Sequence, residues 1–216
     1  MKGGINLSSL VLNKCSPRDN RIKKESIDRA YPIWLLVNPK YPAVRHDIWT
    51  PILDEIQDKV YRKLHIRINT EKIFIKNAVS DIGLVPNTLN WWAADVVQEI
   101  VMFRESVLKH QPKILITIGA FPYEFVRRAF EVKPKKGPKY WSNANLEDEF
   151  ERSIANFDIN RTNRIPLLRK VVMSGKLNEY RNYSSLKENE NYFRDVGIKI
   201  AKKIIENEHS LKIWIE

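Results

Sequence analysis

The stretch Trp34-Leu-Leu-Val-Asn-Pro-Lys-Tyr-Pro42 is the strongest indication of the fold. Ile33 to Val37 forms a short apolar run without charge and predicts a buried strand. The strand stops at Asn38-Pro39, because proline lacks a backbone donor and disfavours the helical conformation in the residue before it. In parallel α/β sheets, ligands bind beyond the carboxyl ends of the strands. Asn38 is therefore a candidate active-site residue, and a simple Asx turn is the alternative interpretation.

Strands and helices alternate along the rest of the chain. After Asn38 the sequence predicts a helix with Thr50 as N-cap and Pro51 at its first position. Further strands are predicted at Glu71–Val79, at Lys113–Gly119 and from Ile165, and further helices at about Trp91–His110, Phe121–Phe130 and Asn191–Asn207. This alternation predicts a three-layer α/β/α fold with a central, mainly parallel sheet of four strands. We expect residues 1–216 to form a single domain with a basic N-terminal segment at 1–30.

Parallel strands place the residues that follow them at one edge of the sheet. The four strand ends predicted here are Asn38, Asn77, Gly119 and Ser174. Right-handed crossovers bring all four to the same side of the molecule. This convergence favours a functional role for the two asparagines.

The composition restricts the classes of function. Lys+Arg 37 against Asp+Glu 26 gives a net charge of +11, which favours nucleic acid as partner, although a basic surface that aids solubility is the alternative. The single cysteine excludes a disulfide framework and a four-cysteine metal site, and the four histidines lack metal-ligand spacing. We therefore expect no metal and no cofactor. Without a signal peptide or an apolar run near ~20 residues, we expect a cytoplasmic monomer with no membrane contact.

Four segments, taken in order, resemble motifs of the uracil-DNA glycosylase superfamily. Asn38-Pro39 after the first strand is similar to its water-activating motif, and Ile73–Val79 to the segment whose asparagine reads the base. His110–Ala120 resembles a helix end followed by Pro-Lys, an apolar strand and Gly. Val171–Leu177 falls where the family usually has His-Pro-Ser and an intercalating loop. The resemblance spans roughly residues 31 to 205 by motif order and implies the fold predicted above.

The sequence departs from the family at two of these motifs. Val172 and Met173 stand where His-Pro is expected, and only Ser174 matches. In the family this histidine stabilises negative charge on the departing base, so another group has to do so here, or activity on uracil is weak or absent. Lys40 also separates Pro39 from Tyr41, whereas the main uracil-excising branch has tyrosine directly after proline.

The resemblance implies roles for residues around the first two strand ends. Asn38 would orient water, and Asp47 is a possible replacement carboxylate, with an ion pair or helix cap formed with Arg45 and His46 as the alternative. The base-binding candidates are Asn77, Trp49, Tyr41 and Pro39. In this group Asn77 would read the base edge, Tyr41 would close one side of the pocket, and Trp49 would stack on the flipped base unless it is a core tryptophan.

A second set of residues would contact DNA. The candidates are Ser174, Gly175, Lys176, Leu177, Lys135, Lys136, Arg161 and Arg164. The first three would hold a phosphate, and Leu177 would fill the space left by the flipped nucleotide. The lysines and arginines would together add salt-dependent affinity for the backbone, although for any single lysine a solvated surface charge is the better interpretation.

Three functions are compatible with these observations. The first is a monofunctional DNA glycosylase acting on uracil or a modified pyrimidine, without strand nicking, because no lysine occupies a motif position as nucleophile. The second is a non-catalytic nucleic-acid-binding module on the same fold. The third, a metal-dependent hydrolase, would need clustered carboxylates, and the acidic run Glu147–Glu151 is more typical of a solvated helix. A role in repair and a role in defence against foreign DNA both remain open.

Overall fold

Four short parallel strands form the central sheet, in the order β2-β1-β3-β4. Their bounds are β1 (Ile33–Val37), β2 (Ile73–Asn77), β3 (Ile114–Ile118) and β4 (Asn163–Leu167). The computed structural model describes residues 31–86, 93–131, 138–169 and 184–215. The strand predicted at Ile33 to Val37 is confirmed, and so is the parallel four-stranded sheet.

Helices connect the strands. The α-helices are α2 (Thr50–Leu64), α3 (Ala94–His110), α4 (Ala120–Phe130), α5 (Asn143–Ala155) and α6 (Ser184–Glu206). A π-helical turn, Arg45–Trp49, precedes α2, and 3-10 turns occupy Thr70–Lys72, Ile82–Leu84 and Pro138–Tyr140. Residues 31–216 belong to one structural unit.

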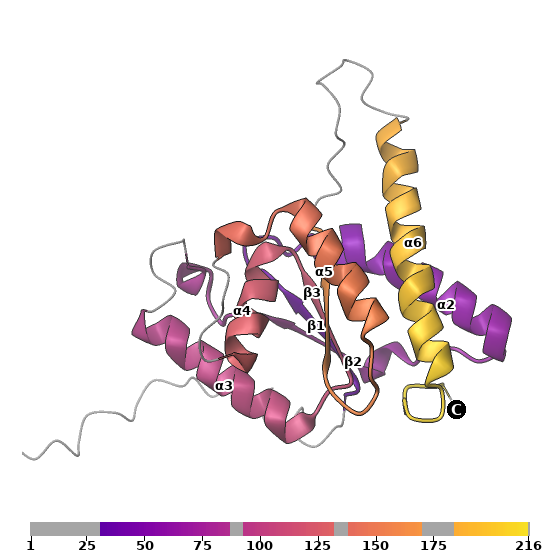
Figure 1. The fold of residues 1–216 in the computed structure, drawn as a ribbon, viewed down its shortest axis with the longest axis horizontal. Helices are drawn as coiled ribbons and strands as arrows, with labels where there is room; N and C mark the ends of the chain where they lie inside the picture. The colour runs from indigo at the N-terminus through magenta and orange to yellow at the C-terminus, as the bar shows by residue number, and fades with distance from the viewer. Residues whose placement is uncertain (1–30, 87–92, 132–137, 170–183, 216) are drawn as a thin grey trace, which may run out of the picture. The chain divides into compact units, whose positions relative to one another are not determined.

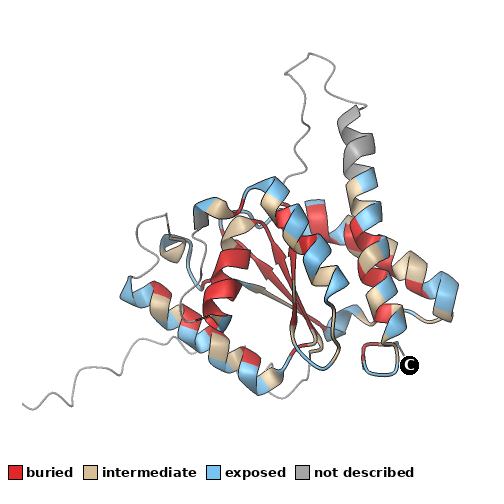
Figure 2. Cartoon of the chain, in the orientation of Figure 1, coloured by how far each residue is buried: buried red, intermediate tan, exposed pale blue. Residues whose placement is uncertain are grey.

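The helices cover both faces of the sheet (Figure 1). Because side chains alternate along a strand, Leu35 and Val37 pack with α2 and α6, whereas Trp34 and Leu36 pack with α3 and α4. The central strands β1 and β3 are therefore buried on both faces, as the coloured cartoon in Figure 2 shows. This arrangement confirms the three-layer α/β/α fold.

The helix predicted from about Trp91 to His110 has the expected buried side. Val96, Ile100, Phe103 and Val107 are all buried in α3. The helix ends at Gln111, whose backbone is left-handed at φ 45° and whose N–H donates to the carbonyl oxygen of Val107 at 2.8 Å. The proline that follows cannot continue the helix.

Two predicted boundaries were wrong. Thr50 is not an N-cap, because the chain is already helical from Arg45, and the Thr50 hydroxyl donates back to the Arg45 carbonyl at 3.2 Å. The π-helical turn gives way to α2 where Pro51 has no N–H to donate to the preceding turn. The fourth strand begins at Asn163 and ends at Leu167, well before Ser174.

A buried ionic cluster fixes the chain after α4. Glu124 is fully buried and accepts hydrogen bonds from Arg127 Nε at 3.0 Å, Arg128 Nε at 2.8 Å and Trp141 Nε1 at 2.7 Å. Removal of a buried carboxylate from its cationic partners is strongly unfavourable, so this cluster ties Trp141, and the helix α5 that follows it, to α4.

The outer edge of β4 lacks one backbone donor. Asn163 N donates to the Lys113 carbonyl at 2.9 Å, and the Leu167 carbonyl accepts from Gly119 N at 2.8 Å. Residues 163, 165 and 167 therefore direct their backbone groups toward β3. Pro166 lies between them, so its ring nitrogen faces away from the sheet, where proline is tolerated in a strand.

Candidate functional site

The carboxyl edge of the sheet gathers three of the four predicted strand-end residues. Asn38 follows β1, Asn77 ends β2, and Gly119 follows β3, all on adjacent parallel strands. Ser174 lies outside the described residues. Because β4 already ends at Leu167, the residues that it delivers to this edge are Leu168 and Arg169.

Asn38 and Gly119 flank the point where the connections of the sheet change direction. The chain leaving β1 leads to α2 on one face, whereas the chain leaving β3 leads to α4 on the other face. Since β1 and β3 are neighbours, the two connections diverge between them. Such a topological switch point is where open α/β sheets bind their ligands.

The Asn38 side chain is held in a fixed orientation. It is only 6% exposed, and its Oδ1 accepts a hydrogen bond from Lys40 N at 2.9 Å. The Asn38 carbonyl also accepts from Tyr41 N at 2.9 Å, so an Asx turn and a β-turn coincide. The alternative of an Asx turn is thus confirmed. Within the described part of the chain, Asn38 Nδ2 has no hydrogen-bond partner, so the turn leaves its amide donor free.

Arg169 joins this edge and was not predicted from the sequence. Its guanidinium lies 4.0 Å from the centroid of the Tyr41 ring, and Tyr41 is 40% exposed. Gly119 makes this approach possible: its φ is +88°, and a Cβ at this position would lie 3.0 Å from Arg169 Cβ. Among the described residues no carboxylate pairs with Arg169.

The electrostatic field at this edge favours an anion. Helix α4 begins directly after Gly119, which has no side chain that could cap the helix. The start of a helix carries a partial positive charge. The aliphatic stem of Arg169 passes Gly119, and its guanidinium lies over Tyr41 at the same edge, so a cationic side chain and a helix start both lie beside the switch point.

Lys76 is a second residue that the sequence analysis missed. It precedes the exposed Asn77 and is paired in register with Leu36. Its Nζ lies 5.5 Å from the centroid of the Phe103 ring, on the α3 face of the sheet. Burial lowers the pKa of the Lys76 ammonium, and the charge of Glu99 only partly opposes this.

Three residues were assigned to the site from the family resemblance, and the structure shows what surrounds each of them. Trp49 is only 3% exposed and belongs to the core formed with α2 and α6, so its ring has no free face for a base. It is the core tryptophan of the alternative interpretation. Pro39 is itself part of the turn and is buried. Asp47 is exposed on the π-helical turn, and no ion pair joins it to Arg45 or His46 in the described structure.

The predicted DNA-contacting residues divide into two groups. Arg161 and Arg164 lie at the amino end of β4, at the opposite edge of the sheet from Asn38, because they come before or at the start of a strand parallel to β1. That these two arginines contact DNA stays a prediction. Lys135, Lys136 and the segment 174–177 (Ser174, Gly175, Lys176 and Leu177) lie outside the described residues.

Comparison with protein-family models, with curated proteins and with solved structures finds no match to this chain. Among residues 31–86, 93–131, 138–169 and 184–215, no helix combines the length and the apolar character needed to cross a membrane. In the same residues no three histidine, cysteine or acidic side chains gather as a metal site would require.

Proposed function

We propose that this protein is a DNA glycosylase that hydrolyses the N-glycosidic bond of a flipped uracil or modified pyrimidine. One observation carries the proposal: the buried Asn38 carboxamide is fixed at the switch point, and its amide donor has no partner among the residues that the structure describes. Arg169 and the start of α4 supply positive charge at the same edge. The motif order described above supplies the reaction class.

Asn38 suits a dissociative mechanism. Its carboxamide cannot take a proton at neutral pH, so it would orient water and not activate it as a base. The C1′–N bond would break first and leave its electron pair on the base. Water would then add to the sugar cation at C1′ and release a proton to solvent. Turnover is expected to be slower than in an enzyme with a carboxylate at this position.

Arg169 would stabilise the departing base. A pyrimidine that leaves with the electron pair of the glycosidic bond is an anion, and a preorganised cation lowers the energy of the transition state. Guanidinium remains protonated in proteins, so Arg169 would act by charge and hydrogen bonding without proton transfer. In this proposal Arg169 does what the missing histidine does in the family.

Tyr41 and Asn77 would contact the base itself. Tyr41 is held by Arg169 and partly exposed, so it can form one wall of a base pocket. The exposed amide of Asn77 offers a donor pair and an acceptor, which match the edge of a pyrimidine. Flipping the base costs a few kcal/mol. Contacts between the DNA phosphates and basic side chains of this protein, whose net charge is +11, would help offset that cost.

The test is base release from oligonucleotides that carry uracil, mismatched thymine, hypoxanthine or modified cytosines. We expect release of one base by the wild type and a loss on the order of 100-fold or more in Asn38→Ala. Arg169→Ala should lose a similar factor, and Arg169→His should recover part of it. Asn160→Ala, an exposed asparagine at the opposite edge, is the matched control and should retain activity.

A non-catalytic nucleic-acid-binding module is the second candidate. The observation that favours it is the Asx turn itself, since Asn-Pro turns form without any catalytic function. If no substrate loses its base while DNA binding persists in wild type and Asn38→Ala alike, the module replaces the enzyme.

A further inference from the structure

A cavity of about 530 Å³ opens at the amino edge of the sheet, away from Asn38. It lies between the C-terminal half of α4, the end of α5 and the start of β4. Its lining comprises Tyr123, Phe130, Glu131, Glu149, Arg152, Ser153, Asn156, Arg161, Thr162, Asn163 and Arg164. This volume is within the range of about 300–1,000 Å³ typical of small-molecule sites. Nothing in the proposed glycosylase uses it.

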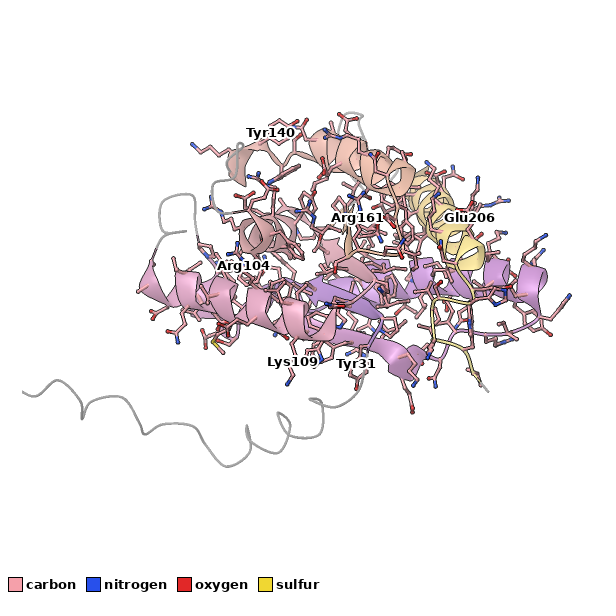
Figure 3. All side chains as sticks on the ribbon, turned by 60° about the horizontal axis from the view of Figure 1, so that its bottom comes forward. Tyr31, Arg104, Lys109, Tyr140, Arg161 and Glu206 are labelled. Atoms are coloured by element: carbon pink, nitrogen blue, oxygen red, sulfur yellow. The ribbon has the colours of Figure 1, made fainter. Side chains whose placement is uncertain are left out.

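Positive charge predominates in this cavity. Three arginines face two glutamates, and the arginines come from three different segments: Arg152 from α5, Arg161 from the α5–β4 loop (labelled in Figure 3) and Arg164 from β4. One positive charge is left in excess. The lining therefore suits an anionic ligand of small size.

One glutamate is already committed to the protein. Glu149 Oε1 accepts a hydrogen bond from the Tyr123 hydroxyl at 2.7 Å, and its Oε2 lies 2.7 Å from Arg152 Nη2. Burial and this carboxylate raise the pKa of Tyr123, so its hydroxyl stays protonated and keeps donating. Arg152 and Glu149 thus neutralise each other on one wall.

Arg161 and Arg164 retain free donors on the other wall. The Arg164 side chain is 34% exposed, lies 3.5 Å from Glu131 and stacks at 5.2 Å over the Phe130 ring. In the described structure it makes no hydrogen bond, although a guanidinium has five donors. Arg161 Nη2 donates to the Asn156 carbonyl at 2.7 Å, which fixes its direction, and its contact with Asp158 is loose at 3.9 Å.

We propose that this cavity binds a phosphate monoester, with its phosphate between Arg161 and Arg164. Paired guanidinium groups match the geometry of phosphate oxygens and donate charged hydrogen bonds to them. Ser153, Thr162 and Asn156 line the remaining space and suit the hydroxyl groups of a sugar. The phosphate belongs to a free sugar phosphate or to the 5′ end of a DNA strand.

Calorimetric titration of the full chain tests this site. The probes are ribose 5-phosphate and ribose, and a short oligonucleotide with and without a 5′-phosphate. We expect binding only when the phosphate is present, and a loss of about tenfold or more in Arg161→Ala and in Arg164→Ala. Arg164→Lys keeps the charge without the fork and should lose less. Arg62→Ala, an exposed arginine on α2, is the control for general charge.

The outcomes separate the two sources of phosphate. Binding of ribose 5-phosphate assigns the site to free esters, and binding of the phosphorylated oligonucleotide alone assigns it to strand ends. No binding of either probe overturns the proposal, as does an equal loss in Arg62→Ala. Circular dichroism spectra of Arg164→Ala and Arg164→Lys, compared with the wild type, show whether the variants are folded. Because Asn38→Ala should not alter this binding, failure here is distinct from failure of the glycosylase proposal.

Discussion

At the scale of single residues, the polar groups near the candidate site differ in how many hydrogen-bond and charged partners they have. The Asn38 oxygen has a partner in its own turn. Among the described residues, Lys76 has the face of the Phe103 ring and a charge interaction with Glu99 as its partners. A buried ammonium without a hydrogen-bonded carboxylate is disfavoured relative to water. Lys76 therefore reduces the stability of the fold at neutral pH.

Replacing Lys76 tests this cost. The pKa of Lys76 is lowered in the folded state. Between that pKa and the ordinary value of 10.5, the folded state therefore binds fewer protons than the unfolded state. Stability of the wild type should rise with pH across this window. Lys76→Met should be more stable than the wild type in urea unfolding at pH 7, and the difference should shrink as the pH approaches 10.5.

The exposed Lys72→Met, which removes one positive charge from the 3-10 turn before β2, is the control for net charge. A Lys76→Met variant that is less stable than wild type at pH 7 would show that the contact with Phe103 outweighs the cost of burial.

Residue roles were harder to predict than elements. Trp49 is buried in a core that includes residues of α6, which is distant from Trp49 in the sequence. The local pattern around Trp49 therefore left two alternatives open. Arg169 could not be found from its neighbours in sequence, because its contacts with Tyr41 and Gly119 join segments that only the sheet brings together. No local sequence motif predicted the contact of Arg169 with Tyr41 or with Gly119.

At the scale of elements, amphipathic pattern was a reliable guide. The four buried residues of α3 follow the helical period. The run without charge at β1 predicted a buried strand, and β1 is indeed covered by helices on both faces. The fourth strand was less predictable, because Asn163 and Arg164 are polar and Pro166 usually argues against a strand. The observed strand places Arg161 and Arg164 at the amino edge of the sheet.

The packing of α2 against α6 gives a prediction at this scale (Figure 1). A Cβ at Gly197 would lie 2.7 Å from Glu55 Cβ and Cγ. Alanine favours a helix over glycine by about 1 kcal/mol, but overpacking costs about 1–3 kcal/mol. Gly197→Ala should therefore lose about 1 kcal/mol in urea unfolding.

Lys202→Ala, on the exposed part of the same helix, should stay within about 0.5 kcal/mol of wild type. If Gly197→Ala were as stable as this control, the two helices would not need the close approach seen here.

At the scale of the whole molecule, the two edges of the sheet have different chemistry. The carboxyl edge combines a fixed amide with Arg169, whereas the amino edge holds a cavity rich in arginine. The net charge of +11 acts over both and favours a polyanion at long range.

The salt dependence of DNA binding measures how much this net charge contributes to affinity. Binding of duplex DNA should weaken about tenfold or more when salt rises from about 50 to about 200 mM, with a linear relation between the logarithms of affinity and salt. The same measurement on Asn38→Ala should give the same slope, since this substitution removes no charge. An affinity that does not change with salt would favour the interpretation that the basic surface only aids solubility.

The proline in β4 has a consequence for how copies of this protein behave together. An open sheet can recruit a strand from another copy wherever its outer strand offers a complete row of donors and acceptors. Pro166 interrupts that row on the outward side of β4. A strand of a second molecule would lose a hydrogen bond at the fourth residue of this five-residue strand. This edge thus carries a built-in protection against polymerisation through the sheet at high concentration.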